Sequence, residues 1–269
     1  AWAKARGCDP KDLACLRALP LERLLPEEPG LEAMGRFLSN PSLFRTGPFK
    51  PHLSPFLLPQ DPREALREGK AAGIPLIAGA NAEEVAFPSL QALLGPGDWE
   101  EAERRLLESG LSREKAQALL AHYRKGVPDP KRAWGEVQTD LTLLCPSLKA
   151  ARLQAPHAPT YAYLFTFRAP GWEGLGAFHG LELAPLFGNL LERPFLPLFL
   201  RQEAQEEAEY LGKKMRRYWT SFAKDGEPKG WPRWPLYREG HLLRLDVPLG
   251  LLPDLYEERC GALEVLGLL

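Results

Sequence analysis

The chain has 269 residues, with 34 Lys and Arg against 35 Asp and Glu, so its formal net charge is -1. Because no long block of like charges occurs, the sequence excludes a nucleic-acid-binding or membrane-surface polyelectrolyte. Hydrophobic residues make up 45% of the chain, which is enough for a sizeable buried core. No apolar run reaches the roughly 18 residues of a membrane span, so none is expected.

The proline content is high, at 27 residues beside 24 glycines and two methionines. Without a repeat period, this composition predicts many fixed loops between short elements, and it favours a bacterial source with GC-rich DNA. The chain does not begin with Met, and its first residues lack the apolar core of a signal peptide, so we interpret Ala1 as a cut and expect a cytoplasmic location. The four cysteines have no zinc-binding spacing.

The first third of the chain predicts short helices and loops. One or two short helices are expected over 10–25, followed by a proline-rich loop over 26–62 and a short helix over 63–68. The apolar run 73–80 is bounded by glycines and predicts a strand buried on both faces, with an edge-like beginning at Pro75.

The middle of the chain predicts a helical hairpin and a long third helix. The hairpin has one helix from Asp98 to Ser109 and a second from Ser112 to Lys125, each with a capping residue at its start. The third helical stretch runs from Pro130 to Gln154, and Pro146 is placed to kink or restart it.

The last part of the chain predicts two strands and two helices. Aromatic and small residues alternate over 161–167, which predicts a strand with one aromatic face. An amphipathic helix is expected over 201–224, a last strand over 242–247 and a last helix over 253–263. This alternation of strands and helices favours a single α/β domain over 1–269.

Two loops follow predicted strands, where open α/β sheets place functional groups. The first, residues 79–84, ends in two glutamates, which by themselves more often charge the first turn of a helix. The second, a glycine-rich loop over 168–183, contains His179, although a lone histidine is more often structural. Taken together, a carboxylate followed by a histidine reproduces the order of acid and base in α/β-hydrolases.

These loops also carry a family resemblance. Residues 79–84 (GANAEE) resemble the type-B carboxylesterase loop G-x-N-x-[DE]-E, and residues 176–183 (GAFHGLEL) with 187–189 (FGN) resemble that family's G-A-x-H-G-x-E-L and F-G-N. In this family the last Glu of the first loop is the triad acid and the His is the general base. The resemblance therefore implies an α/β-hydrolase fold with a mostly parallel sheet and flanking helices, and it implies catalytic roles for Glu84 and His179.

The similarity extends along essentially the whole chain. It includes the stretches 7–17, 49–62, 218–223 and 226–235. Two departures are Ser54-Pro55, where Asp-Gly is usual, and Val85, where a small residue is usual. The resemblance also implies the cysteine pairs Cys8–Cys15 and Cys145–Cys260, for which we expect Cα separations under about 7 Å.

The sequence contains neither G-x-S-x-G nor an H-G-G loop, so the nucleophile elbow and the oxyanion-hole amides are missing. By resemblance, both lie upstream of Ala1, and the chain is the C-terminal half of a carboxylesterase domain. Ser54, Ser89 and Ser147 carry little weight as replacement nucleophiles, because none is in a strand-to-helix elbow. The expected reaction is hydrolysis of a small carboxylic ester through an acyl-serine, with no cofactor and no metal, and the chain alone is expected to be inactive.

Other candidates receive a structural interpretation. Glu182 is expected to hydrogen-bond near the histidine loop, and Trp172, Phe178 and Phe187 are either pocket or core residues. Structural or surface roles are expected for His52, His122, His157 and His241. Two alternatives remain for the whole chain: a non-catalytic cholinesterase-like binding domain, or an inactive truncated gene product. The presence of both Glu84 and His179 argues against the binding domain, and an in-frame G-x-S-x-G upstream in the DNA would argue against the truncated product.

Overall fold

A computed structural model of the chain describes residues 2–9, 11–24, 53–84, 95–188 and 201–269. By their internal contacts the residues divide into two compact units, Ala1–Ser39 and Asn40–Leu269. The predicted single domain over the whole chain stays a prediction. The described part of the smaller unit has three short helices, α1 (Trp2–Ala5), α2 (Leu13–Ala18) and α3 (Leu21–Leu24). Two of them fall in the region where one or two short helices were expected.

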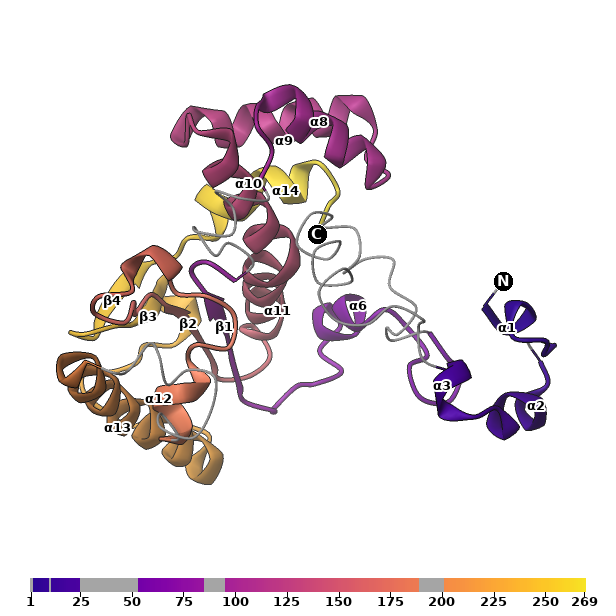
Figure 1. The fold of residues 1–269 in the computed structure, drawn as a ribbon. Coiled ribbons are helices and arrows are strands. Elements are labelled where there is room, and N and C mark those ends of the chain that lie inside the picture. Colours follow the sequence, from indigo (N-terminus) through magenta and orange to yellow (C-terminus); the bar gives the residue numbers. More distant parts are fainter. Residues whose placement is uncertain (1, 10, 25–52, 85–94, 189–200) are drawn as a thin grey trace. The chain divides into compact units, whose positions relative to one another are not determined.

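The larger unit is built from a sheet and helices (Figure 1). Its described helices are α6 (Pro62–Arg67), α8 (Trp99–Glu108), α9 (Arg113–Gly126), α10 (Pro130–Thr139), α11 (Cys145–Gln154), α12 (Leu183–Phe187), α13 (Gln202–Asp225) and α14 (Gly261–Val265). The described strands are β1 (Leu76–Asn81), β2 (Thr160–Phe165), β3 (His241–Leu245) and β4 (Gly250–Pro253). They pair in the order β1-β2-β3-β4, in which β1-β2 and β2-β3 are parallel and β3-β4 is antiparallel. The expected mostly parallel sheet with flanking helices is confirmed.

The helices begin at the residues that local chemistry predicts. The side chain of Asp98 accepts a hydrogen bond from the Glu101 amide at the start of α8, and Ser112 caps α9 in the same way. The third helical stretch is interrupted, because a π-helical turn over Asp140–Leu144 separates α10 from α11. Helix α11 then restarts with Pro146 in its first turn, as expected.

Strand predictions at the two ends of the sheet were partly wrong. The strand expected to be last is β3, and it is followed by β4, whose four residues carry too little alternation to be recognised without the partner strand. The last helix is shorter than expected, because Pro253 ends β4 and a π-helical turn precedes α14. Strand β1 was expected to be buried on both faces, yet its first four residues are half-buried. Among the described strands it has a neighbour on one edge alone, which leaves the other edge open.

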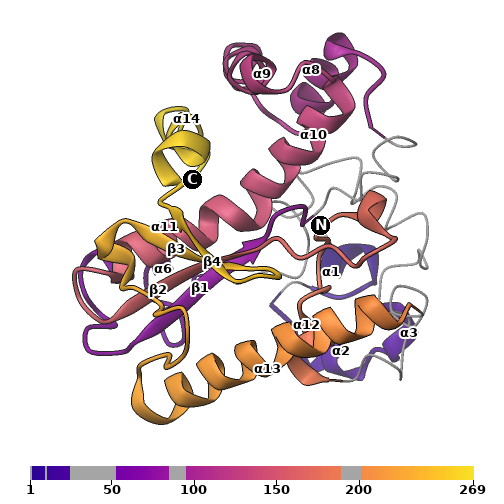
Figure 2. The same cartoon turned by 90° about the vertical axis from the view of Figure 1, so that its left-hand side faces the viewer.

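Helices cover both faces of the sheet, with α11 on one side and α12 and α13 on the other (Figures 1 and 2). Alternate residues of β2 point into two separate cores: Ala162 and Leu164 into the first, Tyr161 and Phe165 into the second. Tyr163, on the predicted aromatic face, makes an edge-on contact with Trp219 of α13. The period-2 pattern of this strand therefore determines which helices pack on which face.

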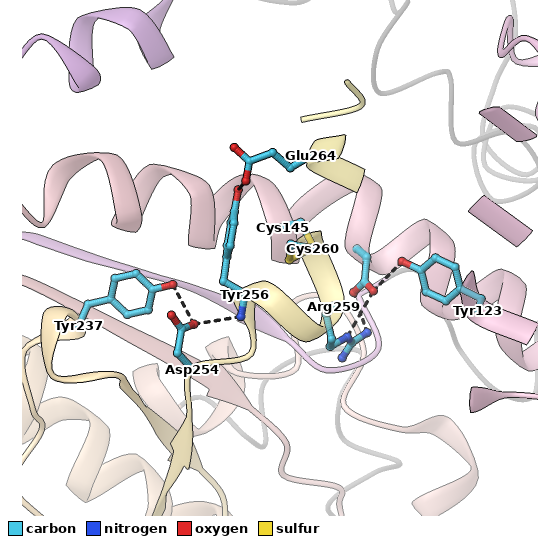
Figure 3. Close-up of a disulfide and its surroundings, with 9 residues drawn as sticks. Tyr123, Cys145, Tyr237, Asp254, Tyr256, Arg259, Cys260 and Glu264 are labelled. Carbon is cyan, nitrogen blue, oxygen red and sulfur yellow. Dashed lines mark hydrogen bonds and ion pairs between the residues drawn. A yellow bond between two sulfur atoms is a disulfide. The ribbon is translucent and has the colours of Figure 1, made fainter. Parts of the chain in front are cut away.

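Both implied cysteine pairs are disulfides. Cys8 and Cys15 have Cα atoms 5.8 Å apart, and those of Cys145 and Cys260 are 5.4 Å apart. The second bridge joins the start of α11 to the residue before α14, beside Arg259 and other polar side chains of the C-terminal segment (Figure 3). It attaches the last residues of the chain to the helical layer on one face of the sheet.

Candidate active site

The acid loop, which the structure describes over residues 82–84, begins where β1 ends. Glu84 lies three residues beyond Asn81, and its side chain is 7% exposed. One carboxylate oxygen, Oε1, accepts a hydrogen bond from the backbone N–H of Asn81 at 2.7 Å. This contact folds the loop back on the strand end, so that the second oxygen, Oε2, is directed away from β1. A buried carboxylate held in this way has one oxygen available for a partner.

That partner is His179. Its Nδ1 atom lies 2.6 Å from Oε2 of Glu84, within the range of about 2.6 to 3.2 Å expected for a hydrogen-bonded acid and base. The imidazole side chain is 68% exposed although the carboxylate is buried. In the part of the chain that the structure describes, no residue hydrogen-bonds to Nε2. The carboxylate therefore occupies one ring nitrogen and leaves the other accessible.

Electrostatics at the pair favour a basic imidazole. The hydrogen bond to Glu84 raises the pKa of His179 above its ordinary value, and the negative charges of Glu84 and Glu182 raise it further, against a partial loss of hydration. A carboxylate at Nδ1 also holds the proton on that nitrogen, so that the lone pair of the neutral ring is on Nε2. The arrangement can accept a proton from a donor that approaches Nε2.

A second set of contacts joins the two loops. The backbone N–H of Glu83 donates to the carbonyl of Ala177 at 3.1 Å, and the Ala177 N–H donates to Oε2 of Glu83 at 2.6 Å. The other oxygen of Glu83 forms an ion pair with Arg168. The two glutamates of the acid loop thus have different tasks: Glu83 binds the backbone of the histidine loop, and Glu84 binds the histidine itself.

Close packing of β1 on β2 depends on Gly79. A Cβ atom at this position would lie 2.4 Å from the carbonyl oxygen of Tyr163 and 2.5 Å from its ring. Any larger residue would push the two strands apart. Because the acid loop leaves β1 and the histidine loop follows β2, this glycine helps to determine the separation of the two loops.

Glu182 is a hydrogen-bonding residue near the histidine loop, as expected. Its Oε2 atom accepts from the side-chain amide of Asn81 at 2.5 Å, and burial raises the pKa of its carboxyl group. Asn81 itself was part of the recognised motif, but no role was predicted for it. Its position at the carboxyl end of a strand, where functional groups gather, was the available signal.

The other candidates lie elsewhere or make structural contacts. Nε2 of His157 pairs with the Arg67 carbonyl, and Nδ1 of His241 pairs with the Glu239 carbonyl. His122 packs edge-on against Tyr123, and Ser54 forms an isolated β-bridge with Leu58. Ser147 is within α11, and Phe178 is buried. Trp172 and Phe187 are exposed. His52, Val85, Ser89 and Asn189 lie outside the described residues.

A cavity of about 950 Å³ lies beside the acid loop. Glu83 and Arg168 belong to its lining, together with charged residues of α9 and α10, but Glu84 and His179 do not. Across the described ranges, no cluster of three or more His, Cys, Asp or Glu side chains is arranged to hold a metal ion. No described helix combines the length and apolar character needed to cross a membrane.

Comparisons with known proteins agree with this architecture. The model of the carboxylesterase family matches residues 1–260. The para-nitrobenzyl esterase of Bacillus subtilis is 30% identical over 194 residues, which cover 71% of this chain and 37% of that protein. A solved PNB esterase structure superposes with a TM-score of 0.72 at 27% identity, covering 98% of this chain and 52% of the other.

A carboxylesterase structure from Geobacillus stearothermophilus gives a TM-score of 0.69 at 27% identity, over 97% of this chain and 52% of that one. The chain therefore spans about half the length of these solved relatives. Their fold is the α/β-hydrolase fold, in agreement with the sheet and helices described above. The family match covers nearly every residue, and the chain belongs to the carboxylesterase family.

Proposed function

We propose that this chain provides the acid and the base of a serine-dependent carboxylic ester hydrolase. The observation that carries the proposal is the 2.6 Å contact between the buried Glu84 carboxylate and the exposed His179 imidazole. The two side chains come from loops that follow neighbouring parallel strands, where α/β folds place catalytic groups. Membership of the carboxylesterase family supports the same class of reaction.

In the first half of the reaction, Nε2 of His179 takes the proton of a serine hydroxyl while the serine oxygen attacks the ester carbonyl carbon. Glu84 stabilises the resulting imidazolium through Nδ1. The tetrahedral intermediate collapses when the imidazolium returns its proton to the leaving alcohol, which gives an acyl-serine. A water molecule then repeats the sequence: His179 takes its proton, the acid departs, and the serine recovers its hydrogen.

The serine is the missing participant. No G-x-S-x-G occurs among the 269 residues, and the solved relatives are about twice as long as this chain. We infer that the nucleophile and the oxyanion-hole amides come from a companion segment outside these residues. Strand β1 has an open edge in the described sheet, so an added strand of that segment has a place to pair.

The test compares hydrolysis of p-nitrophenyl butyrate by this chain alone and by the chain combined with an upstream half that carries the serine. The chain alone should be inactive because it lacks the serine, and it should be poorly soluble because one edge of β1 is open in the described sheet. The combination should be active and soluble. In the combination, His179→Ala should lower kcat by roughly 10⁴-fold or more. A matched control is His157→Ala, which removes a histidine that pairs with the backbone carbonyl of Arg67 and should leave kcat unchanged.

Two results would contradict the proposal. Robust turnover by the chain alone that is lost in His179→Ala would reveal a nucleophile within these residues. Full activity of His179→Ala in the active combination would remove His179 from the mechanism.

A further inference from the structure

We propose that Asn81 is a positioning residue that holds Glu84 and His179 in register with each other. This inference rests on the proposed function, because it concerns the same acid and base. Asn81 is the last residue of β1 and is 1% exposed. A buried polar side chain must find hydrogen-bond partners, and the partners of this one belong to the two catalytic loops.

The backbone of Asn81 acts on the acid. Its N–H donates to Oε1 of Glu84 at 2.7 Å, and His179 binds the other oxygen, Oε2, at 2.6 Å. The carboxylate is thus held between the strand end and the imidazole. With one oxygen occupied, the side chain has little freedom to turn its second oxygen away from Nδ1.

The side chain of Asn81 acts on the base. Nδ2 donates to the carbonyl of Phe178, the residue before His179, at 2.7 Å. The same nitrogen donates to the carboxylate of Glu182, three residues after the histidine, at 2.5 Å. Both hydrogens of the amide are therefore used, one on each side of His179 along the chain. The histidine loop is fixed at two points to the strand that positions the acid.

The chemistry of these contacts explains why the residue is an asparagine. A backbone carbonyl accepts hydrogen bonds and cannot donate them, so the atom facing Phe178 has to be a donor. An aspartate would place a third carboxylate against Glu182, and an alanine would leave two buried acceptors without their donor. A short side chain with two N–H groups satisfies both.

His179 reports on this arrangement through its own titration. The acidic groups acting on it are Glu84, through a hydrogen bond, and Glu182, through charge. Burial raises the pKa of Tyr163, and the charges of Glu182 and Glu84 raise it further. Arg168 is paired with Glu83. Loss of the Asn81 side chain weakens the contact between Glu84 and His179. It also removes the hydrogen-bond donor that favours an ionised Glu182. Both effects lower the pKa of His179.

The test is a nuclear magnetic resonance titration of the histidine ring signals in the 269-residue chain, supplied with its companion half if solubility requires it. In Asn81→Ala the pKa of His179 should fall by about half a pH unit or more, and the downfield signal of its Nδ1 proton should be lost. Asn81→Ser can donate to one acceptor and should give a smaller shift, which keeps the test informative if the alanine variant does not fold.

The matched control is Gln154→Ala. Gln154 is also buried, and its side-chain amide also donates two hydrogen bonds to backbone carbonyls, those of Ala71 and Ile74, before the opposite end of β1. It should cost similar stability and leave the His179 titration unchanged. Wild-type titration in folded Asn81→Ala or Asn81→Ser, or an equal shift in Gln154→Ala, would overturn the positioning role.

The titration and the esterase assay separate the two proposals. If Asn81 variants titrate like the wild type while His179→Ala abolishes esterase activity, the positioning role fails and the proposed function stands. If the pKa falls as expected but His179→Ala remains fully active, the proposed function fails instead.

Discussion

Arg259 forms a bidentate ion pair with Asp140, although 119 residues separate them in sequence. Nη2 donates to Oδ1 at 2.6 Å and Nε to Oδ2 at 3.3 Å, and the hydroxyl of Tyr123 donates to the same carboxylate at 2.8 Å. Asp140 is fully buried, and burial raises its pKa to about 6 despite the arginine. Arg259 directly precedes Cys260, and Figure 3 shows Arg259 and Tyr123 on the same side of the Cys145–Cys260 disulfide.

This ion pair predicts a large effect of removing one charge. Asp140→Asn leaves the largely buried Arg259 guanidinium without its hydrogen-bonded counter-charge and should lower the free energy of unfolding by about 3 kcal/mol or more. The control is Asp225→Asn, which removes the partner of Lys229 in a solvent-exposed pair and should cost far less. Urea denaturation of the folded protein measures both. Equal, small losses would mean that the buried pair contributes no more than a surface pair.

The two disulfides should differ in their contribution because they close loops of different length. Cys145 and Cys260 are 115 residues apart, and Cys8 and Cys15 are 7 residues apart. The chain-entropy relation gives about 5 kcal/mol for the long loop and about 2 kcal/mol for the short one. Paired Cys→Ala variants compared by thermal and urea unfolding test this order. A larger loss for the Cys8/Cys15 variant would show that loop entropy does not dominate here.

Stability should depend on pH through His179. Its folded-state pKa is raised, so the stabilisation from its partners is complete below the ordinary histidine pKa of about 6.5 and is lost as pH rises through the folded value. The unfolding free energy of the wild type minus that of His179→Gln should therefore decrease as the pH rises above about 6.5. A difference that is constant over this range would show that His179 gains nothing from Glu84 in the folded protein.

Gly79→Ala should be strongly destabilising, because the new Cβ would meet the Tyr163 carbonyl at 2.4 Å. Overpacking between paired strands is expected to cost about 3 kcal/mol or more in unfolding free energy. Under the proposed function it should also lower esterase activity of the chain combined with its upstream half, since the acid loop and the histidine loop leave these strands. Gly126→Ala is the matched control: a Cβ there has nothing within 4 Å, and the change should be neutral or slightly stabilising. Comparable melting temperatures for the two variants would refute the close-approach argument.

Local chemistry in the sequence determined most of the helices. Asp98 and Ser112 cap α8 and α9 with side-chain hydrogen bonds that span three residues, so the signal and its effect lie in the same short segment. The alternation in β2 likewise reports its two faces directly. The pairing of Glu84 with His179 was predictable for a different reason, because the specific histidine motif and the acid loop together carry the family resemblance.

Other contacts between distant segments were decided by the tertiary structure. Strand β4 exists because four residues pair with β3, and β1 is less buried than its apolar sequence suggests because one of its edges has no described neighbour. Asn81 reaches Phe178 across 97 residues, and Arg259 reaches Asp140 across 119. Such contacts depend on the relative placement of strands and helices, which no local period or capping signal encodes. The sequence identified Glu84 and His179 as the candidate acid and base, and the fold determined that Asn81 contacts the loops of both.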